Sequence, residues 1–159
     1  MYQNFGPLID EAIQLELNVA KLYLLFHKLL PEDAAFWWGL VIEEENHAAL
    51  LRTIEQMDAS QVEIPDGILP NGVAELQKAN QMILKAMEDF EKQPDRAYAF
   101  QLAHKIEMSA GESHYNNFMN NAPESPIVEI FRTLNRDDLN HARRIQEYEK
   151  ENLDSYREG

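Results

Sequence analysis

The chain has 159 residues, of which 45% are apolar and none is cysteine, and its formal net charge is -14. This length and composition predict a single folded domain over residues 1–159 rather than a disordered segment. The lack of cysteine excludes disulfides, zinc–thiolate sites and iron–sulfur clusters, and the acidic charge opposes binding to nucleic acid or to an anionic membrane.

The sequence also bears on membrane insertion and secretion. No stretch of about eighteen uninterrupted apolar residues occurs, so we expect no membrane span. Residues 1–10 lack the basic stretch followed by an apolar run that marks a signal peptide. A cytoplasmic protein is therefore the expectation.

The residue pattern predicts an all-α fold, because strand-like alternation is absent and the seven prolines fall at segment boundaries. In chain order, the expected helices are 6–30, 34–58, 73–93, 95–120 and 127–153. Breakers mark a connection over residues 59–72, and a turn is expected over 121–126.

The four longer predicted helices divide into two similar hairpins, 6–58 and 95–153. The connection within each hairpin is short, whereas the join between the hairpins is long and carries the helix 73–93. We therefore expect a four-helix bundle of two helical hairpins with a long crossover that carries an additional helix. The apolar face of that crossover helix is compatible with a homodimer.

The two hairpins carry matching pairs of a carboxylate and an imidazole. One pair is Glu44-x-x-His47 and the other is Asp138-x-x-His141. A spacing of three residues places both members of a pair on one helix face. A single pair of this kind arises often by chance, whereas two copies in equivalent positions favour a shared site.

A further glutamate stands upstream of each pair, Glu16 in the first hairpin and Glu107 in the second. On each long helix the carboxylate falls within the apolar stripe that should face the core. Four buried carboxylates repel one another, whereas two divalent cations supply the four positive charges that neutralise them. Carboxylates and imidazoles without thiolate suit iron or manganese, and zinc is a substitute. The predicted metal ligands are Glu16, Glu44, His47, Glu107, Asp138 and His141.

The alternative is a bundle without metal, in which the same residues form buried carboxylate–histidine pairs.

Neighbouring residues add further expectations. Glu43 and Asp137 each precede a ligand carboxylate and could bind the histidine of the opposite hairpin, because ligating histidines usually donate their second N–H. We expect Tyr23 to hydrogen-bond a ligand carboxylate, and His114, in the equivalent place, to be a structural histidine.

These motifs resemble those of the rubrerythrin-like, ferritin-like diiron carboxylate proteins, and the resemblance covers nearly the whole chain. It implies a ferritin-like bundle that holds two iron ions, with Glu44 and Asp138 as the bridging carboxylates at which catalysis takes place. The remaining ligands that it implies are Glu16 and His47 at one metal and Glu107 and His141 at the other.

The resemblance implies a non-haem diiron oxidoreductase that reduces O2 or H2O2, as an oxidase, peroxidase or ferroxidase. Its electrons would come from Fe2+ or from a separate donor. Three features depart from the family: Asp138 replaces a Glu, Ala110 stands where rubrerythrin peroxidases have an additional Glu, and the cysteines of a rubredoxin-like domain are absent. The alternatives are a non-catalytic metal-binding or helical interaction module and an iron-storage subunit. Glu45 disfavours storage of the bacterioferritin type, which has a haem-binding Met at that position.

Overall fold

The computed structural model describes residues 6–57, 72–110 and 124–157. These ranges contain five α-helices and one short 3-10 helix, and no strand. The elements are α1 (Gly6–Leu29), η1 (Pro31–Asp33), α2 (Ala34–Glu55), α3 (Val73–Lys92), α4 (Arg96–Ala110) and α6 (Pro126–Arg157). The predicted all-α class is therefore confirmed for the described part of the chain.

The helix boundaries agree closely with those expected from the sequence, except at the last helix. α6 continues to Arg157 instead of ending at residue 153, because no proline or glycine interrupts the chain before Gly159. Three expected segments lie outside the described residues: the connection 59–71, the end of the helix over 111–120 and the turn up to residue 123.

Proline, glycine and a capping side chain set several helix ends. Pro31 stops α1 because the residue before a proline is pushed out of the helical region, and Leu30 has φ −122° and ψ 73°. Gly72 precedes α3 with a φ of 84°, a conformation that a side chain would strain. The Asp95 carboxylate accepts a hydrogen bond from the Tyr98 N–H at 3.0 Å and caps the start of α4.

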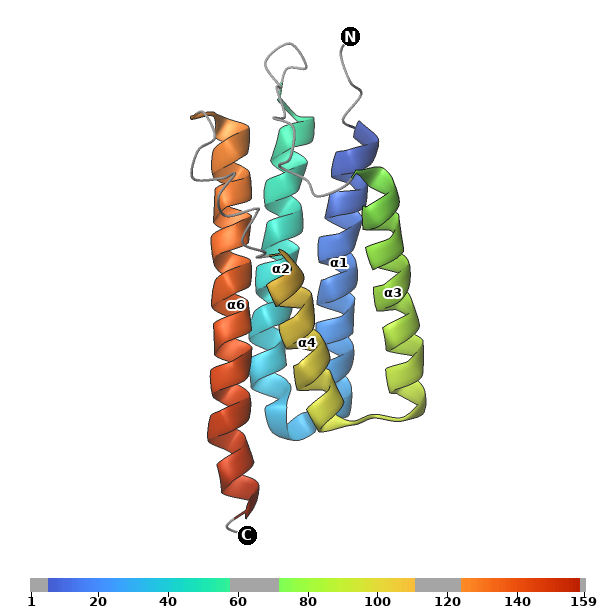
Figure 1. The fold of residues 1–159 in the computed structure, drawn as a ribbon, viewed down its shortest axis with the longest axis vertical. Helices are drawn as coiled ribbons and strands as arrows, with labels where there is room; N and C mark the ends of the chain where they lie inside the picture. Colours follow the sequence, from blue (N-terminus) through green and yellow to red (C-terminus); the bar gives the residue numbers. More distant parts are fainter. Residues whose placement is uncertain (1–5, 58–71, 111–123, 158–159) are drawn as a thin grey trace.

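Four of the helices form two hairpins (Figure 1). α1 packs along α2, α4 packs along α6, and α2 contacts α6 between the hairpins. α3 packs against α1 and carries the chain back along the length of the bundle, so that α2 and α4 run in the same direction (Figure 1). The additional helix expected in the crossover is therefore α3.

Buried amides fix how α3 packs against α1. Asn18 Nδ2 donates to Asn80 Oδ1 at 2.9 Å, and Asn80 Nδ2 donates to Glu11 Oε2 at 2.9 Å. Asn18 and Asn80 are both buried. Because a buried amide without a partner is costly, sliding α3 along α1 would be unfavourable.

A buried ion pair closes the end of the bundle where α1 ends and α4 begins. Arg96 donates to Asp33 through Nε at 2.6 Å and through Nη2 at 2.9 Å, and the Tyr148 hydroxyl donates to the same carboxylate at 3.1 Å. Asp33 is only 2% exposed, so this two-pronged pair is shielded from water. It ties η1 to both helices of the second hairpin.

The apolar core consists of two clusters, one towards each end of the bundle. The upper cluster lies where α1 begins and includes Ile9, Ile13, Ala48, Leu51, Ile127, Phe131 and Leu134. The lower cluster lies where α1 ends and includes Val19, Tyr23, Phe26, Trp37, Val41, Phe90, Phe100 and Ile145. Between them, each of the four hairpin helices, α1, α2, α4 and α6, places a carboxylate. We call this region the polar layer: Glu16, Glu44, His47, Glu107, Asp138 and His141.

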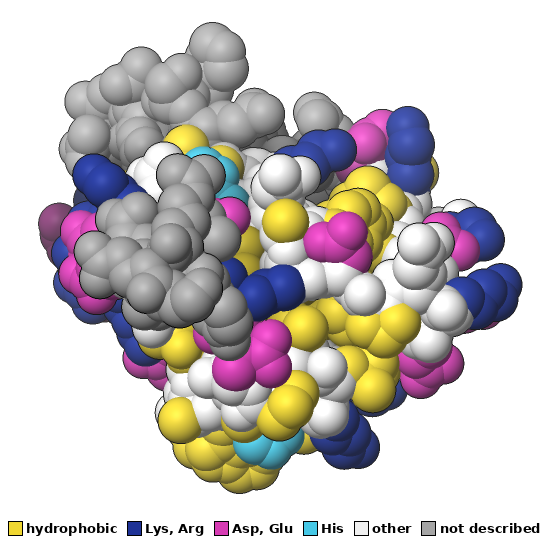
Figure 2. All heavy atoms as spheres, turned by 90° about the horizontal axis from the view of Figure 1, so that it is seen from below, with side chains coloured by type: hydrophobic (Ala, Val, Ile, Leu, Met, Phe, Trp, Pro, Cys, Tyr) yellow, Lys and Arg dark blue, Asp and Glu magenta, His cyan; other side chains and the backbone are white. Residues whose placement is uncertain are grey.

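Large apolar side chains are also exposed at the surface. They are Leu29, Trp38, Ile42, Met82, Leu84, Tyr98 and Met108. Seen from the lower end, apolar side chains lie among acidic and basic ones (Figure 2). The homodimer expected from the sequence stays a prediction. Within the described ranges, none of the helices combines the length and the apolar composition needed to cross a bilayer.

Candidate metal centre

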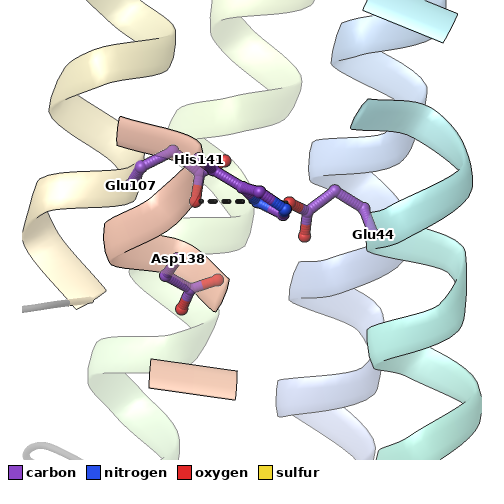
Figure 3. A group of neighbouring side chains, drawn as sticks. All are labelled: Glu44, Glu107, Asp138 and His141. Atoms are coloured by element: carbon purple, nitrogen blue, oxygen red, sulfur yellow. Dashed lines mark ion pairs between the residues drawn. The ribbon is translucent and has the colours of Figure 1, made fainter. Parts of the chain in front are cut away.

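The six predicted ligands come together in the polar layer from four helices. α1 supplies Glu16, α2 supplies Glu44 and His47, α4 supplies Glu107, and α6 supplies Asp138 and His141. Figure 3 shows four of them, with the His141 ring reaching from α6 towards Glu44 on α2. Residues far apart in the sequence thus surround one small region in the middle of the bundle.

The polar layer contains two overlapping groups of ligand atoms. Within each group, all the ligand atoms lie within 4.8 Å of one another. The first group, the His141 position, consists of Glu44, Glu107, Asp138 and His141. The second group, the His47 position, consists of Glu16, Glu44 and His47. Glu44 belongs to both groups, as a bridging ligand would. Asp138 borders both, because its Oδ1 also lies 3.7 Å from His47 Nδ1.

Both histidines turn the same ring nitrogen, Nδ1, towards the carboxylates. His141 Nδ1 lies 2.8 Å from Glu44 Oε1 and 3.6 Å from Glu107 Oε2. His47 Nδ1 lies 3.3 Å from Glu44 Oε2 and 3.6 Å from Glu16 Oε2. The two rings are nearly parallel, with centroids 5.4 Å apart. The two Nδ1 atoms therefore offer one imidazole ligand to each position.

The outer nitrogen of each histidine meets a carboxylate of the opposite hairpin. His47 Nε2 forms a hydrogen bond with Asp137 Oδ2 at 3.3 Å, and His141 Nε2 lies 3.1 Å from Glu43 Oε2. The contacts expected of Glu43 and Asp137 are therefore present. A carboxylate at Nε2 favours the tautomer that carries its proton there, which leaves Nδ1 free to bind a cation.

Tyr23 reaches the polar layer from the lower cluster. Its buried hydroxyl donates a hydrogen bond to Glu107 Oε1 at 2.5 Å, which is the contact with a ligand carboxylate that the sequence predicts. Burial, followed by the charge of Glu107, raises the pKa of the Tyr23 hydroxyl well above its usual value. The hydroxyl therefore keeps its proton and, as a hydrogen-bond donor, orients the Glu107 carboxylate.

Three buried atoms in the layer have no hydrogen-bond partner: Glu44 Oε1, His47 Nδ1 and His141 Nδ1. Glu44 Oε1 and His141 Nδ1 are close together but are not aligned for a hydrogen bond. Unpartnered polar atoms are rare inside proteins and each costs about 1–3 kcal/mol. A divalent cation bound by these atoms would satisfy them and neutralise the carboxylates, so the residues fit a metal ion.

The same atoms also bind protons strongly. Burial raises the pKa of Glu16 to about 8, although His47 opposes the shift. Burial lowers the pKa of His47, but the neighbouring carboxylates of Glu16 and Glu44 outweigh it and raise the pKa to about 12. For His141, Glu107 and Glu44 likewise outweigh burial and raise the pKa to about 10. Protons and divalent cations therefore compete for the layer.

The ligand pattern in the sequence does not single out Arg144, which supports the layer from outside. Its Nη1 donates to both oxygens of Glu43, at 2.7 and 3.0 Å. Arg144 stands three residues after His141, and this spacing on one helix face is a signal that could have identified it. The side chains of Ala110 and His114 lie outside the described residues, so the expectations for them stay predictions.

Compared with protein-family models, with curated proteins and with solved structures, the chain matches none. A function must therefore be inferred from the chemistry of the polar layer itself.

Proposed function

We propose that the chain is a ferritin-like diiron carboxylate protein that reduces O2 or H2O2 in the polar layer. The observation that carries the proposal is the shared position of Glu44. This buried carboxylate faces the unpartnered Nδ1 atoms of His47 and His141, one from each hairpin. One carboxylate between two imidazoles, with a further carboxylate beside each of them, supports two neighbouring cations rather than one.

The charge and the ligand types support the choice of metal. Two divalent cations balance the four carboxylates and leave both imidazoles neutral, which removes the cost of burying like charges together. Oxygen and imidazole donors without thiolate suit iron or manganese. A pair of bound ferrous ions would supply two electrons, and with two protons these reduce H2O2 to two waters.

The residues of the chain have separate tasks in this proposal. Glu44 holds the two positions together, and Asp138 borders both. Tyr23 keeps a proton beside Glu107 Oε1, within the region where protons are consumed. The apolar clusters above and below the layer limit the access of bulk water. Electrons would come from Fe2+ itself or from a separate donor.

The second candidate is a metal-binding module without turnover. The observation that favours it is the enclosure of the His141 position, where the Glu44, Glu107 and His141 side chains are only 2–3% exposed. A site that opens little to solvent suits a structural metal. The shorter reach of Asp138, compared with the Glu that the resemblance leads one to expect, points the same way.

Anaerobic loading with two equivalents of Fe2+, followed by exposure to O2 or H2O2, tests the proposal. We expect two irons per chain, rapid oxidation and a new near-ultraviolet absorption band, with consumption of oxidant measured in parallel. Glu45→Ala is the matched control, because Glu45 lies next to Glu44 on α2 but is exposed. One tightly held zinc, with no oxidation of added Fe2+ above the rate without protein, would refute the redox function.

A further inference from the structure

The two positions of the polar layer are held with unequal rigidity. At the His141 position, Tyr23 donates to Glu107, and Glu43 faces the outer nitrogen of His141. Arg144 in turn hydrogen-bonds to Glu43, with Nη1 at 2.7 and 3.0 Å from the two carboxylate oxygens. Glu107 and His141 of this position therefore each have a partner that fixes their orientation.

Support at the His47 position is weaker. Asp137 forms a longer contact with His47 Nε2, at 3.3 Å, and the ion pair of Asp137 on its other side is with Arg136 Nε, at 4.0 Å. Arg136 is 71% exposed, so water screens this pair. Among the described residues, no side chain outside the layer hydrogen-bonds to Glu16, whose own side chain is 17% exposed.

The exposure of the outer carboxylates does not explain the difference, because Glu43 and Asp137 are equally exposed, at 40%. What differs is the cation behind each of them. Arg144 is only 34% exposed and makes two short contacts, whereas Arg136 makes one long one. The number of residues that could bind a metal ion differs as well, with four at the His141 position and three at the His47 position.

From this asymmetry we infer that the two metal positions are unequal: a first divalent cation binds tightly at the His141 position, and a second binds weakly and exchangeably at the His47 position. Arg144 is a positioning residue for the tight site, because it fixes Glu43 and through it the His141 ring. The inference rests on the proposed dinuclear site but not on any reaction there. Its chemical scope is a first-row divalent cation bound by carboxylates and imidazole.

Titration of the metal-free protein with Co2+ tests the order of binding. We expect two steps in calorimetry and in the visible absorption of Co2+, with dissociation constants that differ by at least about tenfold. His47→Ala should keep the tight step and lose the weak one, whereas His141→Ala should lose the tight one. Two equal steps, or a tight step that survives in His141→Ala but not in His47→Ala, would overturn the inference.

The role of Arg144 has its own test. Arg144→Gln should weaken the tight step by roughly 10- to 100-fold and leave the weak step and the far-ultraviolet circular dichroism unchanged. Arg143→Gln is the matched control, since Arg143 lies next along α6 but pairs with exposed Glu147 at 3.2 Å. Arg144→Lys should recover part of the lost affinity. Equal effects of Arg144→Gln and Arg143→Gln on the Co2+ spectrum and affinity would contradict the assignment.

The failure of this inference can be told from the failure of the proposed function, because Co2+ binding needs no oxidant. Two unequal Co2+ steps together with inert bound iron would refute the redox function and support the inference. Rapid iron oxidation together with two equal Co2+ steps would do the opposite.

Discussion

The polar layer and the lower apolar cluster are neighbours on the same helices, and both are largely buried. In the cluster, the Phe26 ring packs edge-to-face on Trp37 and on Phe90, with ring centroids 4.9 and 4.7 Å apart. In the layer, Glu44 faces His141 and both have a buried atom without a hydrogen bond. Burial stabilises the fold in the first region, whereas in the second it costs free energy until a cation or protons compensate.

The two regions therefore contribute differently to the molecule. A bundle whose sequence had only to specify the fold could continue its apolar core through the middle. Protein cores tolerate many apolar substitutions when the total volume is kept. The chain instead interrupts the core with a carboxylate on each of the four hairpin helices. On the proposed function, the polar layer would serve metal binding at the expense of stability, and the two clusters would supply the stability that it lacks.

The largest expected effect is loss of metal from the layer. Glu44→Ala removes the carboxylate shared by both positions, and His141→Ala removes an imidazole ligand, so each should abolish binding of two metals. Helix content should survive, because both apolar clusters are intact. Metal analysis after iron loading and far-ultraviolet circular dichroism check the two halves of this prediction. Unchanged metal content in both variants would show that the ligands are assigned wrongly.

Truncating the lower cluster should have the opposite signature. Phe26→Ala deletes a ring with no exposed surface and should lower the free energy of unfolding by about 3–5 kcal/mol. Metal stoichiometry should stay at two under conditions where the variant is folded. Urea denaturation measures the loss of stability, and Leu84→Ala on the exposed side of α3 is the control, expected to change it by less than about 0.5 kcal/mol. A larger effect of Leu84→Ala than of Phe26→Ala would be inconsistent with the two-cluster core.

Making the layer resemble the cluster should stabilise the metal-free protein. Replacing the facing pair by Glu44→Leu with His141→Leu should raise the free energy of unfolding by about 1–4 kcal/mol, because buried charges give way to apolar packing. Thermal and urea unfolding of metal-free samples measure the change. The exposed pair Lys85 and Asp89, changed together to Ala, is the control, expected to give a change near zero. A double Leu variant that is less stable than the parent would argue that the layer supports the fold.

The last expected effect concerns pH and is gradual. The folded protein holds protons with a raised pKa at Glu16 (about 8), His141 (about 10) and His47 (about 12), whereas the unfolded chain releases them nearer 4.5 and 6.5. The unfolded state therefore binds fewer protons, and the stability of the metal-free protein should fall as pH rises from about 5 towards 9, by of order 1 kcal/mol per pH unit.

Urea midpoints of metal-free protein at several pH values check this sign. Metal affinity should move the other way and strengthen over the same range, because fewer protons compete with the cation. Stability of the metal-free protein that increases with pH would contradict the crowding of carboxylates and histidines in the layer.

Much of the fold was predictable because local chemistry marks it. Pro31 ends the first helix whatever surrounds it, and helical periodicity shows which face of each helix is apolar. The polar layer was predictable for the same reason, since Glu44 and Asp138 interrupt apolar stripes at matching places. The contacts of Glu43 and Asp137 follow from a further regularity, their positions next to those carboxylates.

Other features depend on contacts between distant segments and have no local signature. Asp33 reads as part of a polar turn, yet in the structure it is the buried centre of a contact with Arg96 and Tyr148. Trp37 and Trp38 are adjacent and identical in type, but Trp37 is buried and Trp38 is 47% exposed. Only the packing of helices against one another determines which of such residues is buried and which is exposed.

In the proposed site, two metal ions share Glu44 in the polar layer. Anomalous diffraction at the iron edge, from crystals of the protein grown with iron, tests it most directly. We expect two anomalous peaks per chain, one among Glu44, Glu107, Asp138 and His141 and one among Glu16, Glu44 and His47. A single peak, or peaks away from Glu44, would contradict the claim.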